Sequence, residues 1–315
     1  MTRRQLLALL SASLARSASR LPANDAIKWA VSSALWSHFR PVPFTEMLDV
    51  MRDTGFIGMR LAGYPQALEN YGLTAAEMER EFARRNLHLV TISYSAPFHD
   101  PAQRKAVMQS ARSAMEFLRG FGANHLVAFP PGRNAPGAED AGAFRELCSR
   151  YNQIGELAGE MGFTAGVHNH LGEMVESPEE VESCLERTNP KLFGFSPDTA
   201  HLHLAGGNVV EILRRHKHRI HFLDYKDARW TTPDADWVEG NGKVLPKDSP
   251  GARFQASIYD LGDGEVDFPE CHRILKSVGY RGWICVDLDT ARKGPRASYE
   301  RCGAYVTSGL EPIYR

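Results

Sequence analysis

Four short segments of the chain each place carboxylate or imidazole side chains at a point where a strand is expected to end. In a closed sheet of parallel strands these ends open into one bowl, so the side chains would meet there. Several acidic groups in such a bowl repel one another, and a bound divalent cation removes that cost. The pattern therefore predicts a metal site built from GVHNHLGE (166–173), FSPDTAH (195–201), HFLDYKDAR (221–229) and WICVDLD (283–289).

Strand geometry restricts which of these side chains can share the bowl. Side chains alternate between the two faces of a strand, so His168 and His170 share one face and Asn169 takes the other. Taken singly, an Asp at a strand end is more often a helix cap or a turn former, and a lone His is usually structural. Four successive strand ends of this kind are hard to explain by capping alone. The further candidates are Asp198, His201, His221, Asp224, Asp227, Asp287 and Asp289.

The elements that must position these residues alternate along the chain after about residue 25. Eight β-rich apolar runs, each followed by a stretch of helical period, predict a single (β/α)8 TIM barrel over residues 26–315. No linker, repeat or low-complexity run marks a second domain. The expected strands are Ile27–Ser32, Phe56–Leu61, Leu87–Tyr94, His125–Phe129, Phe163–His168, Phe193–Asp198, Ile220–Tyr225 and Trp283–Asp287. The expected helices are Phe44–Asp53, Ala75–Arg85, Pro101–Phe121, Ala143–Met161, Pro178–Thr188, Val209–His216, Pro269–Val278 and Ala297–Val306.

Composition excludes some classes of function. Lys and Arg number 37 against 38 Asp and Glu, which gives a net charge of −1 and no overall attraction to nucleic acid or an anionic membrane. The hydrophobic fraction of 43% supplies one large core. The five cysteines show no paired spacing, so we expect buried, inert thiols. The composition is compatible with a homo-oligomer as well as a monomer.

Residues 1–25 look like a targeting signal rather than part of the fold. Arg3-Arg4 precede a short apolar run from Leu6 to Ala15, a pattern typical of twin-arginine export to the bacterial periplasm. That run is far shorter than the ~20 residues of a membrane span. Arg16 follows closely and no clean A-x-A cleavage site is present. An amphipathic helix or a mobile tail on a cytoplasmic protein therefore remains the alternative.

The connection after the seventh strand is unusually long. From Ala228 to Asp260 it shows no helical periodicity, and a loop of this length in a compact domain is usually functional or mobile. It would lie over the mouth of the barrel. The rings of Trp230 and Trp237 in this connection either pack on a sugar or form a small aromatic cluster of the loop itself.

Together these motifs resemble the xylose-isomerase-like sugar phosphate isomerase/epimerase superfamily of TIM barrels. Among its members, the motifs are most similar to those of inosose dehydratases and ketose epimerases. The resemblance covers residues 27–310, and its most specific marks are HNHLGE, PDTAH, LDYKDAR and LGDGEVDFPECHRILKSVGYRGWICVDLD.

The resemblance implies four metal ligands, which in the family are Glu, Asp, His and Glu. The matching residues in this chain are His168, Asp198, Asp224 and Asp287, so three of the four differ in type. The inventory of three carboxylates and one imidazole is unchanged, as if a His and a carboxylate had exchanged strands. An oxygen-rich set with one nitrogen favours Mn²⁺, with Mg²⁺ or Co²⁺ as alternatives, over a structural Zn²⁺ site.

The resemblance also implies how the site would act. In the family the ion stabilises an enediolate of a hydroxy-ketone, and two acid/base groups move protons. Those two groups correspond to His168 and Asp287. A metal-bound imidazole has no free lone pair, so the base is then His170 or Glu173. Glu173 and His201 resemble residues that contact substrate hydroxyls, and Arg229 either holds a substrate oxygen or forms a surface salt bridge.

Earlier strands are expected to supply the rim that faces the substrate. Many relatives carry Glu at the end of the second strand, where this chain has Arg60. An Arg there favours an anionic substrate or pairs with the acidic metal ligands. The residues expected at this rim are Trp29, Arg60, Tyr94 and His99.

The leading hypothesis is a metal-dependent isomerase or epimerase that acts on a keto-sugar or a related polyol through an enediolate. A lyase that dehydrates an inosose or keto-sugar is the alternative, because the HNH run resembles inosose dehydratases more than ketose epimerases. A non-catalytic sugar-binding barrel is a third possibility. The balanced charge and single ligand set disfavour a DNA-repair nuclease.

Overall fold

The computed structural model describes residues 20–21 and 24–314. The export segment predicted for residues 1–25 lies almost wholly outside this range, so it stays a prediction. Among the described residues, no helix is both long enough and apolar enough to cross a membrane.

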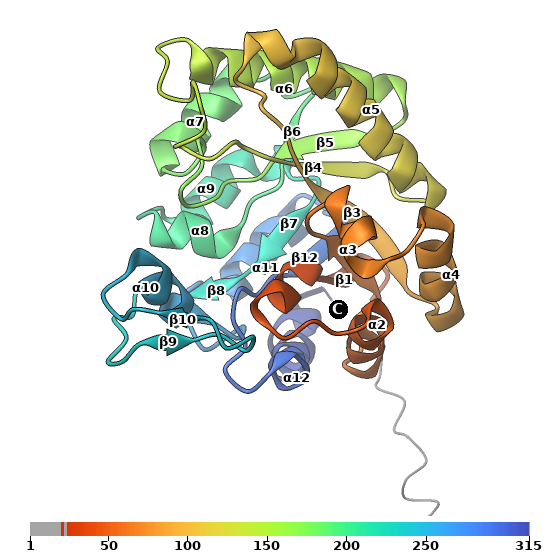
Figure 1. The fold of residues 1–315 in the computed structure, drawn as a ribbon, viewed down its shortest axis with the longest axis vertical. Helices are drawn as coiled ribbons and strands as arrows, with labels where there is room; N and C mark the ends of the chain where they lie inside the picture. Colours follow the sequence, from red (N-terminus) through yellow and green to blue (C-terminus); the bar gives the residue numbers. More distant parts are fainter. Residues whose placement is uncertain (1–19, 22–23, 315) are drawn as a thin grey trace, which may run out of the picture.

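A parallel barrel forms the centre of the molecule (Figure 1). Its strands are hydrogen-bonded in the order β6-β5-β4-β3-β2-β1-β12-β7. Parallel bridges from Phe195 to Ile220 and from Asp198 to Asp224 link the two outer strands, so the sheet is nearly closed. This confirms the single (β/α)8 barrel. The strands are β1 (Ile27–Ser32), β2 (Gly58–Leu61), β3 (His88–Ser95), β4 (His125–Phe129), β5 (Thr164–Val167), β6 (Gly194–Phe195), β7 (Leu223–Tyr225) and β12 (Gly282–Val286).

Helices surround the barrel, and most begin within a few residues of the expected positions. Their amphipathic faces pack on the strands, and side-chain caps such as Thr74 and Ser177 fix where two of them start. The outer helices are α2 (Phe44–Asp53), α3 (Gln66–Tyr71), α4 (Ala75–Arg85), α5 (Arg104–Gly120), α6 (Ala143–Glu160), α7 (Pro178–Arg187), α8 (Thr199–Leu204), α9 (Val209–His216), α11 (Phe268–Ser277), α12 (Pro295–Tyr305) and α13 (Glu311–Tyr314).

Apolar side chains fill two separate layers. A small cluster inside the barrel contains Ala30, Val90, Val127, Phe222 and Cys285. A much larger cluster lies between the strands and the surrounding helices. All five cysteines are buried and free, as expected. The division between layers decides which strand residues can reach the site.

A β-bulge in β3 changes the direction of the side chains that follow it. The pairing of β2 with β3 runs from Met59–Leu89 directly to Arg60–Thr91, which leaves one extra residue on β3. Such an insertion reverses the alternation of faces beyond it. As a result Ser93 faces Arg60 in the barrel, and Tyr94 faces outward.

The long seventh connection is more regular than expected. Its residues 229–257, here called the cap segment, contain the hairpin β9 (Trp237–Val238) and β10 (Val244–Leu245) and the helix α10 (Pro250–Ser257). The prediction of a segment without helix was wrong at α10. Pro250 begins that helix and Ser249 caps it, but only eight residues follow, too few for a clear apolar period. The cap segment leaves and re-enters the barrel through β8 (Asp227–Ala228), which pairs with β11 (Ile258–Tyr259).

Candidate metal centre

Three of the predicted ligands meet at the carboxyl ends of adjacent strands. His168 directly follows β5, Asp198 follows β6 as the cap of α8, and Asp224 lies within β7. One donor atom from each lies within 4.8 Å of the other two, and each residue is 0% exposed. Within the described part of the chain, this is the one group of three or more His, Cys, Asp or Glu side chains that could hold an ion.

Several donor atoms of these three residues have no hydrogen bond. Asp198 Oδ1 accepts from the amides of Ala200 and His201 at 2.9 and 3.0 Å, and its Oδ2 has no hydrogen bond but lies 3.1 Å from the Lys226 ammonium. Asp224 Oδ1 accepts from Arg60 at 3.1 Å, and its Oδ2 also has no hydrogen bond. Neither ring nitrogen of His168 has a hydrogen bond. Buried polar atoms are rarely left unpaired, so these three residues fit a bound divalent cation.

The electrostatics of the three residues agree with this interpretation. Burial raises the pKa of Asp198 to about 7 and that of Asp224 to about 6, because the charged carboxylates lose water. Burial, together with nearby Arg60 and Lys226, holds the pKa of His168 well below its usual value. A neutral imidazole is the form that binds a metal, and a bound cation would favour ionised carboxylates.

The fourth expected ligand, Asp287, has other partners. It directly follows β12, and its Oδ2 lies 2.8 Å from Arg60 Nη2 and 2.8 Å from Lys226 Nζ. Burial alone would raise the pKa of Asp287, but Lys226 and Arg60 hold it below the ordinary value. Asp287 is not part of the group of three converging donors.

Lys226 is a site residue that the sequence interpretation did not select. It is 1% exposed, and its ammonium lies 3.1 Å from Asp198, 2.8 Å from Asp287 and 2.7 Å from Asp289. Although burial opposes the charged form, these carboxylates hold the pKa of Lys226 well above its usual value. The signal was its position two residues after Asp224, which puts both side chains on one face of the strand.

Arg60 lies at the site, as expected of the rim. It is 2% exposed, and it reaches from β2 to Asp224, Asp287 and Ser93. It therefore pairs with the acidic side chains, which was one of the two roles left open by the sequence.

His170 and Glu173 lie together beside the three donors. The His170 Nδ1–H donates to the Leu171 carbonyl at 2.8 Å, so the lone pair is on Nε2. Burial, with Lys226 and His168 nearby, lowers the pKa of His170 to about 4. Burial raises the pKa of Glu173 to about 8. At neutral pH the neutral imidazole of His170 therefore lies beside the protonated carboxyl group of Glu173, with Nδ1 and Oε1 3.7 Å apart.

His201 connects the site to the cap segment. Its Nε2 lies 3.1 Å from Lys226 Nζ, and its ring centroid is 3.8 Å from that of His170. On its other side, Phe254 of α10 stacks on it with centroids 5.5 Å apart and planes at 6°. The cap segment thus contributes an aromatic ring next to the site.

Three of the expected rim residues do not reach the site. Trp29 lies on the outward face of β1, where its indole N–H donates to Glu311 at 2.7 Å and its ring stacks on His272. Tyr94 is turned outward by the bulge in β3 and bonds to α5 at Val107. His99 donates to the Pro136 carbonyl at 3.0 Å. The placement of Trp29 and Tyr94 among the substrate contacts was wrong, because strand alternation and the bulge point them under the helices.

Arg229 lies on the surface rather than at the site, which agrees with the surface role of the two that the sequence left open. It is exposed in the cap segment, where its guanidinium lies 4.8 Å from the centre of the Tyr259 ring. The antiparallel pairing of β8 with β11 carries it away from the bowl. Arginines also lie over the rings of the tryptophans of this segment, Arg253 over Trp230 and Arg292 over Trp237. Trp230 is still 44% exposed, so the two roles that the sequence left open for these rings stay predictions.

Asp227 is structural. Its carboxylate accepts from the amides of Ala228, Gly262, Gly264 and Val266 at 2.8–3.1 Å. A Cβ at Gly264 would lie 2.3 Å from Asp227 Oδ1, so glycine is required there. Asp227 therefore fixes the loop that returns from the cap segment, one residue beyond Lys226.

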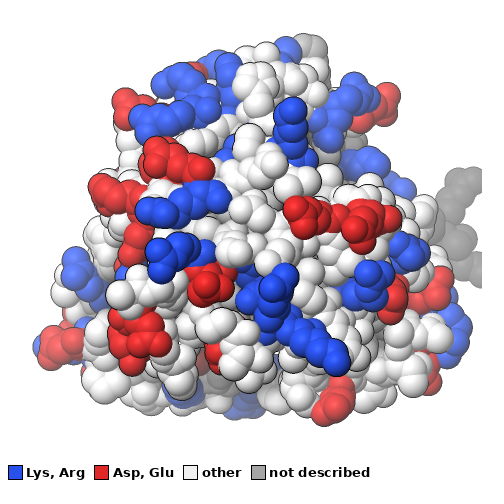
Figure 2. Space-filling model, turned by 90° about the horizontal axis from the view of Figure 1, so that it is seen from above, with Lys and Arg blue, Asp and Glu red and all other residues white. Residues whose placement is uncertain are grey.

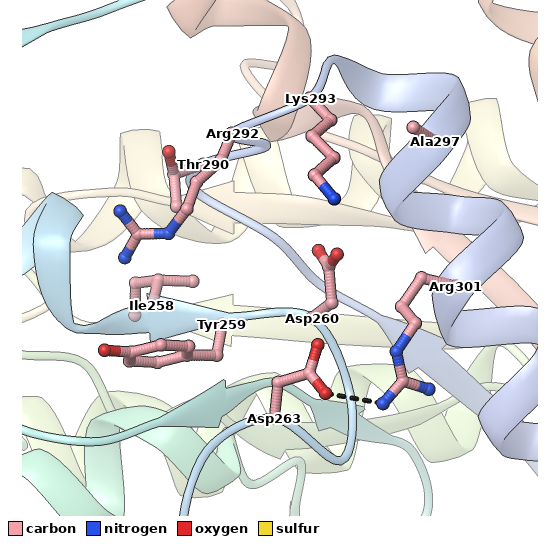
Figure 3. Close-up of a pocket in the computed structure, with 9 residues that line it drawn as sticks. All are labelled: Ile258, Tyr259, Asp260, Asp263, Thr290, Arg292, Lys293, Ala297 and Arg301. Carbon is pink, nitrogen blue, oxygen red and sulfur yellow. Dashed lines mark hydrogen bonds and ion pairs between the residues drawn. The ribbon is translucent and has the colours of Figure 1, made fainter.

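A cavity of about 560 Å³ lies beside the site rather than in it (Figure 3). It is open between the loops that follow β11 and β12 and the first turn of α12. Figure 3 shows Lys293 and Asp260 pointing toward one another across it, and Asp263 paired with Arg301. Both signs of charge line the cavity, and none of the three converging donors does. On the face drawn in Figure 2, acidic and basic side chains are similarly interspersed.

Comparisons with known proteins agree with this fold and site. A model of the xylose isomerase-like TIM barrel family matches residues 48–302, and the chain belongs to that family. It is similar to the inosose dehydratase of Bacillus velezensis, with 28% identity over 224 residues that cover 67% of this chain and 72% of the relative. The inosose dehydratase of Lactiplantibacillus plantarum is 23% identical over 313 residues, which cover 91% and 98%.

Solved structures show the same fold. The probable 3-DHS dehydratase AsbF from Bacillus anthracis gives a TM-score of 0.69 at 14% identity, covering 90% of this chain and 99% of that one. The IolI protein with a bound zinc atom gives 0.68 at 14% identity, covering 91% and 99%. An L-ribulose 3-epimerase gives 0.67 at 14% identity, covering 92% and 96%. With the curated relatives, these findings make the chain an enzyme of this family.

Proposed function

We propose that this enzyme is a divalent-metal-dependent lyase that removes water from an inosose or a related keto-sugar. The observation that carries the proposal is the convergence of one donor atom each from the fully buried His168, Asp198 and Asp224 at the strand ends. The similarity to inosose dehydratases supports the substrate class and the reaction.

The donor set indicates which ion the site would take. Two carboxylates and one imidazole suit Mn²⁺ first, then Mg²⁺ or Co²⁺. Zinc is included among the ions to test, since a zinc atom is bound in the IolI structure. When held by His168, Asp198 and Asp224, such an ion would act as a Lewis acid that makes the C–H bond beside the substrate carbonyl more acidic.

His170 and Glu173 supply the proton transfers in this proposal. The unprotonated Nε2 of His170 takes the proton from the carbon next to the carbonyl. The bond from the adjacent carbon to its hydroxyl then breaks, and the protonated Glu173 gives its proton to the departing oxygen, which leaves as water. Exchange with solvent then removes the proton from His170 Nε2 and returns one to Glu173, which restores both groups.

The positions of the acid/base groups favour a lyase over an epimerase. An epimerase needs one such group on each face of the substrate carbon. In this chain the position that matches the family's second group is Asp287, and Arg60 and Lys226 both pair with its Oδ2. The lone pair of His168 would be used by the ion. Proton transfer from one side is therefore the better-supported chemistry.

Product analysis tests the proposal. The metal-loaded protein is incubated in D₂O with a panel of inososes and ketohexoses, and the products are identified by NMR and mass spectrometry. We expect a product lighter by one water. His170→Gln and Glu173→Gln should each lower kcat by about 100-fold or more. His203→Gln and Glu179→Gln, which change the same residue types outside the site, should not.

Two other outcomes would contradict the lyase. Deuterium incorporation or a new sugar epimer without loss of water would identify an isomerase or epimerase. Binding of metal and sugar with neither exchange nor water loss across the panel would identify a sugar-binding barrel without catalysis.

A further inference from the structure

We infer that the ion is held by only three side chains, His168, Asp198 and Asp224, and that Asp287 instead anchors two buried cations, Arg60 and Lys226. The inference rests on the proposed function, because it specifies the ligands of the same metal site. It departs from the four-ligand set that the family resemblance implies.

The contacts of Asp287 are the first argument. Its Oδ2 receives Arg60 Nη2 and Lys226 Nζ, each at 2.8 Å. Its Oδ1 has no hydrogen bond, yet no atom of Asp287 joins the group of mutually close donors that the described residues form. Asp287 is also one methylene shorter than the Glu that the family resemblance implies at this position. Reaching the ion would require it to leave both cations.

Arg60 makes that movement costly. Its guanidinium lies between two carboxylates, with Nε 3.1 Å from Asp224 Oδ1 and Nη2 2.8 Å from Asp287 Oδ2. A guanidinium presents donors in a rigid fork and has no acceptor, so it cannot take the place of a ligand. If Asp287 moved onto the ion, the fully buried Arg60 would lose a charged partner. Arg60 thus fixes Asp224 toward the ion and Asp287 away from it.

Lys226 is compatible with an ion at the three donors. Of its three carboxylate contacts, those to Asp289 and Asp287 are the shorter, at 2.7 and 2.8 Å. Asp198 Oδ2 lies at 3.1 Å, and this is the atom that would turn to the ion. Lys226 therefore keeps two partners when Asp198 is used as a ligand. Asp287 and Asp289 hold the ammonium beside the ion rather than on it.

The count of charges agrees with one divalent ion. Four buried or half-buried carboxylates, Asp198, Asp224, Asp287 and Asp289, face two cations in direct contact with them. Two negative charges remain, which is the charge that one divalent cation compensates. A buried cluster is stable only when its charges are paired in this way.

A three-ligand site has a direct consequence for substrate binding. A catalytic metal site must keep open positions, and a six-coordinate ion with three protein ligands keeps about three. Two adjacent oxygens of a keto-sugar can occupy two of them. Arg60 is then a positioning residue that keeps Asp287 from closing one of these positions.

Matched Asp→Asn variants of the full chain test the ligand set. Dissociation constants for Mn²⁺ are measured by equilibrium dialysis for the wild type, D198N, D224N, D287N and D289N, with circular dichroism as a check of folding. D287N and D289N each remove one carboxylate from Lys226, so D289N is the control for the loss of charge near the ion. We expect D198N and D224N to weaken binding by about 100-fold and D287N to match D289N within about threefold.

A loss in D287N that exceeds the loss in D289N by tenfold or more would overturn the inference while leaving the metal site in place. Failure of the wild type to bind Mn²⁺, Mg²⁺, Co²⁺ or Zn²⁺ would instead overturn the proposed function.

If D287N does not fold, water-proton relaxation of Mn²⁺ bound to the wild type decides. A value of roughly three bound waters supports three protein ligands, and roughly two or fewer contradicts them.

Discussion

His168 and Asp224 lie close enough for their roles as ligands to be exchanged. Their Nδ1 and Oδ2 atoms are 3.2 Å apart, and both side chains are fully buried. The resemblance implies a carboxylate at the first position and an imidazole at the second. This chain has the reverse, so the two positions together still supply one carboxylate and one imidazole. We therefore infer that the imidazole and the carboxylate have exchanged strands and that both still point to the proposed ion.

A pair of substitutions tests the exchange. His168→Glu alone places three carboxylates at the proposed ion and removes the nitrogen donor, so we expect it to bind Mn²⁺ at least about tenfold more weakly than the wild type. Adding Asp224→His restores the family's arrangement and should recover much of that affinity. Isothermal titration calorimetry measures both. A double variant that binds no better than the single one would count against the exchange.

At the scale of elements, the cap segment connects opposite parts of the barrel mouth. Its helix α10 places Phe254 on His201, and its hairpin reaches the loop after β1. There Glu239 lies 3.2 Å from His38 Nδ1, and the Asn241 amide donates to the His38 carbonyl at 3.0 Å. The fully buried donors of the site therefore lie beside an element whose hairpin makes polar contacts with the loop after β1. Such elements open more easily than the barrel itself.

Loosening that contact should expose the cap segment. Glu239→Ala removes the carboxylate that pairs with His38, so local opening becomes easier while the barrel core is untouched. We expect proteolytic cleavage within residues 229–249 to become about two- to tenfold faster. Asp248→Ala removes an exposed carboxylate of the same segment and serves as the control. Equal cleavage rates in the two variants would show that Glu239 does not hold the segment.

At the scale of the whole molecule, the barrel interior carries buried neutral histidines as well as apolar side chains. His125 at the start of β4 contacts Thr164 Oγ1 at 2.7 Å and Ser196 Oγ at 2.9 Å. Burial, with His221 nearby, lowers its pKa to about 3. The unfolded chain binds a proton near the ordinary value of ~6.5. The stability that His125 contributes is thus complete above that pH and is lost progressively as the pH falls toward about 3.

Urea unfolding at two pH values measures this effect. With a chelator present, the loss of the His125 contribution should lower the free energy of unfolding of the wild type by about 2 kcal/mol between pH 7.5 and pH 5. His125→Gln keeps hydrogen-bonding groups but cannot be protonated. Between the same two pH values its free energy of unfolding should therefore fall by about 2 kcal/mol less than that of the wild type. His218→Gln, on the surface, is the control. An identical pH dependence in all three proteins would contradict the account.

Much of the fold was predictable because its signals are periodic. The barrel strands and the long helices follow alternation and helical period, and β1, β4, α2, α4 and α9 have the expected bounds. Features without a period were missed. The eight residues of α10 are too short to show one, and the bulge that turns Tyr94 outward depends on pairing with β2.

The site was predictable only in part, for a related reason. The strand-end rule finds His168, Asp198 and Asp224, because the direction of a strand end follows from the fold. It also pointed to Asp287, whose partners depend on contacts between distant strands. Arg60 and Lys226 reach Asp287 from β2 and from the end of β7, and no local pattern in the sequence predicts these contacts.

Anomalous scattering from crystals grown with Mn²⁺ would locate the ion itself. We expect one strong peak between β5, β6 and β7, about 2.0–2.3 Å from a nitrogen of His168 and from Oδ2 of Asp198 and Asp224. In the same crystals Asp287 should remain on Arg60 and Lys226. A protein without a peak at this position, or with the ion bound only by surface carboxylates, would contradict the account.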